Sequence, residues 1–433
     1  MSRNLKIIYI SRITMSASRA LAAVLVPIYF ALLGLKGTQL GLIFFGVAIV
    51  STLISTLSGM TSDRIGRKPF LIFIPLLASI AAVAFILTTN IYLLALFSML
   101  GSFGRGAGAG AGQIGPYQPV ESALAVESVE SSKRNQVFGR LAFASSIGAL
   151  IGSAIAITFP PQNHLVLHSL GMFKIGFLTT AIGPLFSSTL AVFIKETHQT
   201  NKQASTETAR RSLNGSNKPK FQLPKNSMWL LKRLFITNGI NGLAVGMFGP
   251  FVTYWLYVKF GVSVSSIGVL YTLVNIATLP STLSAAPIAK KLGLVKTVTL
   301  VRTIQALLLI PMVLAPTYAI AGGIYLVRMV FQRIGMPLRQ SYVVAMADKD
   351  ERATVTALSN IPSQTANAIG PAFAGYLFDN VSLDLPFMLA AIFQLLNSGL
   401  YWIFFHKIPP QDEKDYNVKL DKTSTENKNS RQD

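Results

Sequence analysis

The chain is an alternation of long apolar stretches and short polar connections. Twelve stretches of about 20 or more mostly apolar residues follow one another, each long enough to cross a bilayer core of about 30 Å as a helix. A longer polar stretch lies between the sixth and the seventh. The pattern predicts an all-α membrane protein with twelve transmembrane helices in two six-helix halves. The stretches cover 7–34, 38–59, 69–89, 91–115, 136–159, 169–194, 228–258, 265–288, 296–315, 318–345, 353–377 and 385–406.

The polar connections divide the chain into four parts. We expect an N-terminal six-helix half over 1–194, a cytoplasmic linker loop over 195–227, a C-terminal six-helix half over 228–407 and a cytoplasmic tail over 408–433. The linker and the tail are polar and lack apolar periodicity, so we expect both to be flexible.

Composition and charge add the orientation. The chain is 51% hydrophobic with 13% charged residues, whereas soluble domains carry about 25% charged residues. Outside the stretches, almost all Lys and Arg fall on one side, and the other side carries only Lys36 and Lys259. Basic loops stay in the cytoplasm. We therefore expect a plasma-membrane protein with both termini in the cytoplasm, and the net charge of +21 reflects topology and anionic lipid rather than nucleic acid.

The two halves resemble each other in sequence. Placing Pro119 on Pro337 also places Arg134 on Arg352, at the same offset. Similar apolar composition explains shared Leu or Val, but not aligned prolines and arginines. Two homologous six-span halves related by an axis along the membrane normal are one plan of secondary transporters. The repeat therefore predicts pseudo-twofold symmetry.

The connection between the second and third stretches carries a motif. From Gly59 to Lys68 it reads G-M-T-S-D-R-I-G-R-K. This resembles the signature G-x-x-x-D-R-x-G-R-K of the major facilitator superfamily, and the resemblance covers essentially the whole chain. It implies a twelve-span secondary transporter that works by alternating access, with a gating motif of Gly59, Asp63, Arg64, Gly66, Arg67 and Lys68.

The resemblance also implies a role for the acid in this motif. Asp63 would pair with Arg67 and with the positive end of the helix that starts near Ala353, closing the cytoplasmic side as a latch. The alternative is that the motif only anchors the loop at the inner leaflet.

Small residues in the fifth and eleventh stretches carry a second resemblance. Gly139, Gly148 and Gly152 are similar to the first part of the antiporter signature of the superfamily's drug-efflux branch, although Ser153 stands where that signature has Pro. This favours efflux. The alternative is that small residues simply let helices approach closely. On either interpretation we expect helix-packing roles for Gly148, Gly152, Gly370 and Pro371.

The superfamily's transport cavity is lined by spans one, four, seven and ten. Carried over, this predicts a substrate cavity with Arg19, Arg105, Asn238, Asn241 and Arg328, because charges inside spans usually face a cavity. Weaker candidates are Lys174, Arg302, Gln364 and Asn367, and Lys174 and Arg302 are expected near helix ends, where they would reach the interface. The alternatives are hydrogen bonds from Arg105 to backbone carbonyls and from the Asn side chains between helices.

The positions of the acidic residues bear on whether transport is coupled to protons. All 17 Asp and Glu fall in loops, tails or span ends in this reading, and Glu121 lies nearest to a span. A buried carboxylate is the usual proton carrier, so proton coupling stays open. Arginines without acidic partners inside spans favour an anionic substrate instead.

Three functions follow, and none is enzymatic. The first is proton-coupled efflux of a small organic solute. The second is uptake or exchange of an organic anion in an arginine-lined cavity. The third is a non-transporting membrane sensor, against which stands the lack of a soluble domain to receive a signal. We expect a monomer in the lipid bilayer with a small-molecule substrate, no cofactor and no metal site. The chain has no Cys for a thiolate site, and its sequence shows no cluster of other metal ligands.

Overall fold

The computed structural model describes residues 3–104, 115–129, 134–159, 166–194, 227–281, 287–289, 292–348 and 351–406. Arg105, most of the linker 195–227 and the whole tail 408–433 lie outside these residues, as do the side chains of Asp63 and Arg64.

The described residues are helical, and no strand occurs among them. Two spans are broken: α4, the short 3-10 helix η2 and α5 form one, and α9, η4 and α10 form another. Counted in this way, the described helices form the twelve spans that the sequence predicts. The N-terminal half holds α1 (Arg3–Leu32), α2 (Gly37–Ile65), α3 (Lys68–Leu87), α4 (Ile91–Gly101), η2 (Gly115–Tyr117), α5 (Gln118–Glu127), α6 (Arg134–Ile157) and α7 (Val166–Val192). The C-terminal half holds α9 (Met228–Phe248), η4 (Gly249–Phe251), α10 (Val252–Phe260), α11 (Val264–Thr278), α13 (Leu294–Val313), α14 (Tyr318–Met346), α15 (Arg352–Asn380) and α16 (Leu385–Phe405).

Eight of the described helical segments are long and apolar enough to cross a membrane. The helices α14 and α15 have 29 residues each, yet they are not among the eight. Both are long enough to span a bilayer core of about 30 Å. They are less apolar because they carry a row of Arg, Asn, Gln and Ser side chains inside the span.

The two halves repeat the same packing. In the N-terminal half α1 packs against α6 and α7, and α3 packs against α7. In the C-terminal half α9 packs against α15 and α16, and α13 packs against α16. Because these helices occupy corresponding positions in the two halves, the arrangement has the pseudo-twofold symmetry predicted from the repeat.

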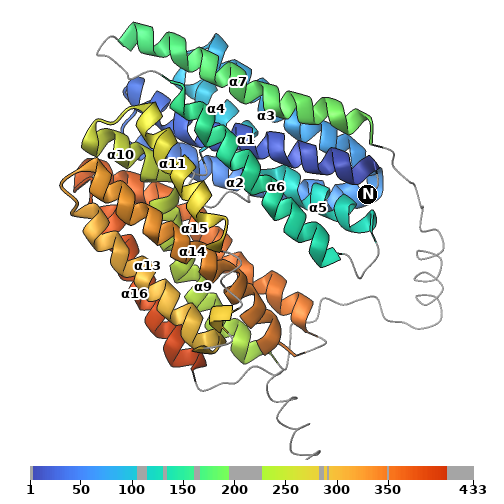
Figure 1. The fold of residues 1–433 in the computed structure, drawn as a ribbon, viewed down its shortest axis with the longest axis vertical. Helices are drawn as coiled ribbons and strands as arrows, with labels where there is room; N and C mark the ends of the chain where they lie inside the picture. The colour runs from blue at the N-terminus through green and yellow to red at the C-terminus, as the bar shows by residue number, and fades with distance from the viewer. Residues whose placement is uncertain are drawn as a thin grey trace, which may run out of the picture.

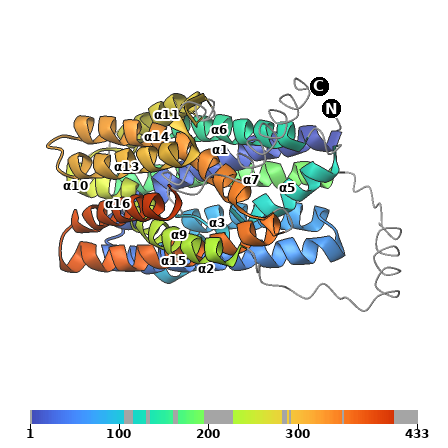
Figure 2. The ribbon, with the colours of Figure 1, turned by 90° about the horizontal axis from the view of Figure 1, so that it is seen from below.

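Two helix pairs join the halves. The pair α2–α15 lies along one edge of the molecule and the pair α6–α11 along the other (Figure 2). We call the end where α1 and α9 begin and α16 ends the terminal end, and the opposite end the far end. Figure 1 shows the halves meeting at the far end and diverging toward the terminal end, where the N-terminus lies.

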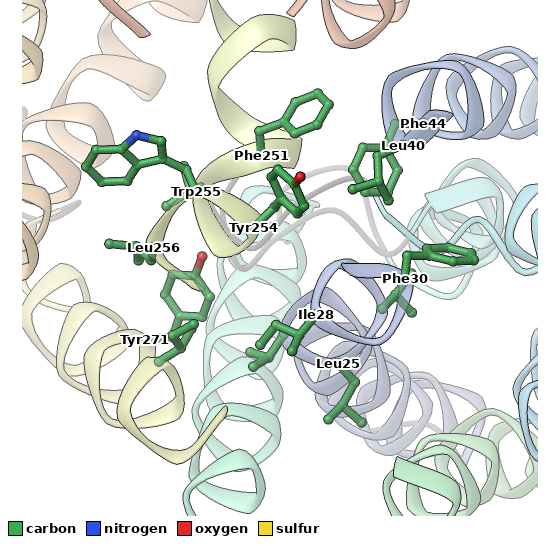
Figure 3. Packing of buried hydrophobic residues seen from close by; sticks show 14 of the residues in the cluster. Leu25, Ile28, Phe30, Leu40, Phe44, Phe251, Tyr254, Trp255, Leu256 and Tyr271 are labelled. Carbon is green, nitrogen blue, oxygen red and sulfur yellow. The ribbon is translucent and has the colours of Figure 1, made fainter. Parts of the chain in front are cut away.

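The apolar core explains this shape. One large cluster of buried side chains spans both halves at the far end (Figure 3). At the terminal end there are two separate clusters, one around Leu5 and Leu141 in the N-terminal half and one around Leu230 and Phe405 in the C-terminal half. The far end is therefore closed and the terminal end is open. The shared cluster includes Leu25, Ile28, Leu40, Phe44, Phe251, Tyr254, Trp255 and Tyr271.

Polar contacts also hold the far end closed. The Asp379 carboxylate at the end of α15 accepts hydrogen bonds from the backbone N–H groups of Gly37 (2.8 Å) and Thr38 (2.7 Å), at the start of α2. The first N–H groups of a helix have no partner within it, and the helix dipole favours a negative charge there. Asp379 thus caps a helix of the other half. A Cβ on Gly41 would overlap the Pro371 carbonyl oxygen, so this crossing of α2 and α15 requires a small residue.

The fourth span differs from its prediction. It does not end near residue 115 but continues through α5 to Glu127. The break after α4 is held by Arg19 of α1, whose Nη1 donates to the Ser102 carbonyl at 3.1 Å. A cation at a helix C-terminus satisfies its last carbonyls and is favoured by the dipole. A broken span needs more residues, which corrects the placement of Glu121: it lies inside the span and is fully buried.

Candidate functional site

A cavity lies inside the C-terminal half, between α9, α13, α14, α15 and α16. It encloses about 190 Å³. Asn241 is 13 residues into α9, so this part of the wall lies about 20 Å from the start of the helix at 1.5 Å per residue. The lining is Asn241, Gly242, Val245, Arg302, Gln305, Arg328, Gln332, Gly335, Arg339, Asn360, Ser363, Gln364, Asn367, Gln394 and Asn397.

Arg328 is the most deeply placed cation of this lining, with 2% of its surface exposed. Its Nη1 donates to Gln332 Oε1 at 3.2 Å and its Nη2 donates to Gln394 Oε1 at 3.3 Å. The guanidinium carbon lies 4.2 Å from the centre of the Phe248 ring, a cation–π contact. Neutral amides and a ring thus stabilise the charge without cancelling it.

A second cationic wall is formed by α13 and α14. Arg302 Nη1 donates to Asn397 Oδ1 at 2.7 Å, and the Arg302 guanidinium lies 5.0 Å from the Tyr401 ring centre. Asn397 in turn donates to the Thr237 carbonyl of α9, which fixes the orientation of its amide. Arg339 of α14 also lines the cavity. The Asn397 amide therefore positions the Arg302 guanidinium before any solute arrives.

The polar side chains that line the cavity are either cationic or neutral. Three arginines and eight Asn or Gln side chains line it beside Ser363, and no carboxylate occurs among the lining residues that the structure describes. A guanidinium is a rigid fork of donors that binds carboxylate or phosphate through two parallel hydrogen bonds. The arrangement suits an anionic or strongly hydrogen-bond-accepting solute. Within the described residues, no group of His, Asp and Glu could hold a metal ion.

The predicted cavity residues divide into two groups. Asn241 and Arg328 line this cavity, together with the weaker candidates Gln364 and Asn367. Arg302 also lines it, so the expectation that Arg302 reaches the interface is wrong: its guanidinium points inward to Asn397.

The other predicted residues lie elsewhere. Asn238 is buried and donates to the Ser359 carbonyl at 2.7 Å, which joins α9 to α15. Arg19 lies in the N-terminal half at the break of span four. Lys174 is exposed on α7. Arg105 lies outside the described residues.

Sequence reasoning missed part of the lining, although a signal was present. Arg328, Gln332, Gly335 and Arg339 stand at i, i+4, i+7 and i+11, which is one face of a helix. Asn360, Ser363, Gln364 and Asn367 form a similar row on α15. Rows of polar residues inside two apolar spans indicate that both helices line the same water-accessible cavity. The residues missed are Gly242, Val245, Gln305, Gln332, Gly335, Arg339, Asn360, Ser363, Gln394 and Asn397.

The gating motif lies at the terminal end, between α2 and α3. Gly66 has φ 107°, a conformation that favours glycine, and it ends α2. Arg67 forms an ion pair with Glu127 at the end of α5, a partner that the sequence did not indicate. Gly59 packs near Pro119, and Lys68 begins α3. The pairing expected of Asp63 rests on a side chain outside the described ones, so the latch stays a prediction.

The predicted packing positions lie at helix crossings. A Cβ on Gly148 would overlap the Ile13 carbonyl oxygen and one on Gly152 the Ala17 carbonyl oxygen, both on α1. In the C-terminal half, a Cβ on Gly370 would come within 2.7 Å of the backbone of α9 at Gly246. The crossings α1–α6 and α9–α15 are thus equivalent close contacts in the two halves.

Comparison with known proteins gives a family and several relatives. The family model described as Major Facilitator Superfamily matches residues 8–233 and 234–429. The multidrug resistance protein MdtG of Enterobacter lignolyticus is 24% identical over 429 residues, covering 95% of this chain and 96% of the relative. MdtG of Yersinia enterocolitica is 24% identical over 411 residues, covering 92% of each chain.

Solved structures share the fold. A bacterial homologue of the human lysosomal transporter Spinster, in an inward-facing and unoccupied conformation, has a TM-score of 0.66 at 14% identity and covers 93% of this chain and 98% of its own. The D-xylose–proton symporter has a TM-score of 0.68 at 13% identity, covering 92% and 97%. At these identities the likeness concerns the fold alone.

Proposed function

The chain belongs to the Major Facilitator Superfamily, and from this premise we propose that it exports a small organic solute bearing an anionic or strongly hydrogen-bond-accepting group. Members of this family are secondary transporters rather than enzymes, and this chain is a multi-pass membrane protein of that kind. The observation that carries the solute class is the cavity with Arg302, Arg328 and Arg339 and no acidic lining residue among those described.

The direction of transport rests on relatives. Two bacterial proteins named for multidrug resistance resemble this chain over nearly their whole length. The glycines of α6 that resemble the antiporter signature also favour efflux. On this proposal the solute enters from the cytoplasm through the open terminal end, and the halves then rock to open the far end.

The orientation follows from the basic loops. The terminal end carries nearly all Lys and Arg that lie outside the spans, so we assign it to the cytoplasm, together with both termini. The conformation described here is then inward-open. We also propose that the transporter acts as a monomer, because the five helices that surround the cavity all belong to the C-terminal half.

Labelling of single cysteines tests the orientation, since the chain has no native Cys. Asn90→Cys, exposed before α4 at the far end, should react with a membrane-impermeant maleimide added to intact cells. Ile65→Cys, exposed at the end of α2, should react only after the cells are permeabilised. The reverse pattern would invert the proposed topology and with it the assignment of efflux.

Flux measurements test the solute class. Purified protein in proteoliposomes is offered a panel of organic carboxylates, organophosphates and lipophilic cationic dyes, with and without a pH gradient. We expect carboxylates or phosphates to be transported and to compete with one another. Robust transport of the cationic dyes, with no competition by the anions, would overturn the anionic assignment and leave only general drug efflux.

A further inference from the structure

One buried acid plays no part in the cavity. Glu121 stands in the first turn of α5, in the N-terminal half, with 0% of its surface exposed. Its carboxylate Oε2 lies 3.2 Å from Nε of Arg12 on α1, which is itself only 4% exposed. Neither carboxylate oxygen accepts a hydrogen bond of good geometry from the residues that the structure describes. The pair is therefore held by charge more than by a network.

The surroundings of this pair are polar but almost uncharged. Tyr117 lies close enough to interact with both charges, and the hydroxyl groups of Ser11 and Ser187 lie beside the Tyr117 hydroxyl; all three residues are fully buried. They come from η2, α1 and α7. The helices α2, α3 and α6 also pack against α5, but Arg12 is the one charged group in the described part of the chain that acts on Glu121. The titratable groups facing Glu121 are thus Arg12 and Tyr117.

Protonation of such a pair changes the net charge buried inside the protein and is therefore energetically costly. When Glu121 is ionised, the pair has no net charge. A proton that binds the carboxylate forms an O–H bond and leaves the pair with the single positive charge of Arg12. A buried charge without its partner costs about 3–5 kcal/mol. Arg12 must then gain water or another acceptor, and α1 and α5 must move apart to admit it.

The helix that carries Arg12 also reaches the closed end. Residues of α1 contact α10 and α11 of the other half, and Thr253 Oγ1 donates to the Ala23 carbonyl at 3.1 Å. Arg19, between these points, holds the break of span four. The helix α1 therefore offers a continuous path from Arg12 to the contact between the halves.

We propose that Glu121 is the protonation site that drives the exchange between the two end states, with Arg12 as its counter-charge. The ion pair seen here is the proton-free form, which belongs to the state open at the terminal end. Proton uptake by Glu121 favours the state open at the far end. The proton site and the solute cavity thus occupy opposite halves. This coupling rests on the proposed transport function, but the protonation step can be tested without any solute.

The test uses spin labels at two exposed positions of the terminal end. Ile65→Cys on α2 and His406→Cys after α16 place one label in each half. Distances are measured by pulsed electron paramagnetic resonance in lipid nanodiscs over a pH series. We expect the labelled parent to shift between two distance populations with pH. Glu121→Gln, which mimics the protonated form, should keep the low-pH distribution at every pH.

Two further variants make the result decisive. Arg12→Gln/Glu121→Gln removes both charges, avoids a lone buried Arg12 and should also lose the pH response. Glu127→Gln, on the same helix but 56% exposed and paired with Arg67, should keep it. A Glu121→Gln protein that shifts with pH like the parent, or a parent that does not shift, overturns the proposal. Failure of the anion flux assay alone would leave this result standing and refute only the solute class.

Discussion

Transport of the solute identified in the flux panel is expected to fall by about 30-fold or more when Arg328 is replaced by alanine. Truncating one partner of a buried charged contact costs about 2–5 kcal/mol, and each 1.4 kcal/mol is a factor of about ten. Arg328 stands at the deepest charged point of the cavity, between Gln332 and Gln394 and over Phe248. Arg328→Lys keeps the charge but not the planar fork, so it should give an intermediate loss.

Arg233 supplies a matched control. It lies in the same half, stacks over the rings of Trp229 and Phe404 and donates to the Phe404 carbonyl, but it does not line the cavity. Arg233→Ala should lower thermal stability while transport per folded molecule is preserved. The same outcome for Arg328→Ala would mean that Arg328 only supports the helices.

A second large effect is expected from Gly41→Leu. The added side chain would collide with the backbone of α15 at Pro371 in the far-end-closed state. Overpacking of this kind costs about 1–3 kcal/mol, which corresponds to a shift of about 5- to 150-fold in the balance between two states. Because this crossing lies at the closed far end, the variant should favour the far-end-open state.

Spin labels report this shift directly. Tyr92→Cys and Val381→Cys lie at the far end, one in each half, and both positions are exposed. Their distance should grow in the Gly41→Leu background, while the distance between labels at Ile65 and His406 should shrink. Gly399→Leu is the matched control, because a Cβ on Gly399 of α16 meets no atom within 4 Å. Unchanged distances in the Gly41→Leu protein would show that the crossing does not limit opening.

The architecture followed from the sequence because bilayer thickness imposes one length on every span. Twelve apolar stretches and an internal repeat were sufficient to predict an all-α bundle of two symmetric halves. Tertiary contacts decided what the pattern could not. A run of 20 apolar residues looks the same whether it forms one straight helix or two short ones, so the break after Gly101 was invisible. Glu121 was therefore placed outside the span that contains it.

The cavity was predicted only in part, for a different reason. Single arginines such as Arg328 were noticed one by one, whereas the cavity is formed by rows of polar residues on α14 and α15. Such residues are recognised as one polar face only when the sequence is projected onto a helix. The face from Arg12 to Arg19 on α1 has the same spacing, yet it packs inside the N-terminal half. Spacing predicts a polar face, but only packing decides what that face contacts.

The apolar cluster shared by the halves at the far end makes the equilibrium between the two end states depend on temperature. Opening that end would expose aromatic side chains such as Phe44, Phe251 and Phe378, which contact one another in the closed form. Exposure of apolar surface to water carries a positive heat-capacity change, and the hydrophobic attraction weakens on cooling. The balance between the two states should therefore curve with temperature, and cold should favour the far-end-open form.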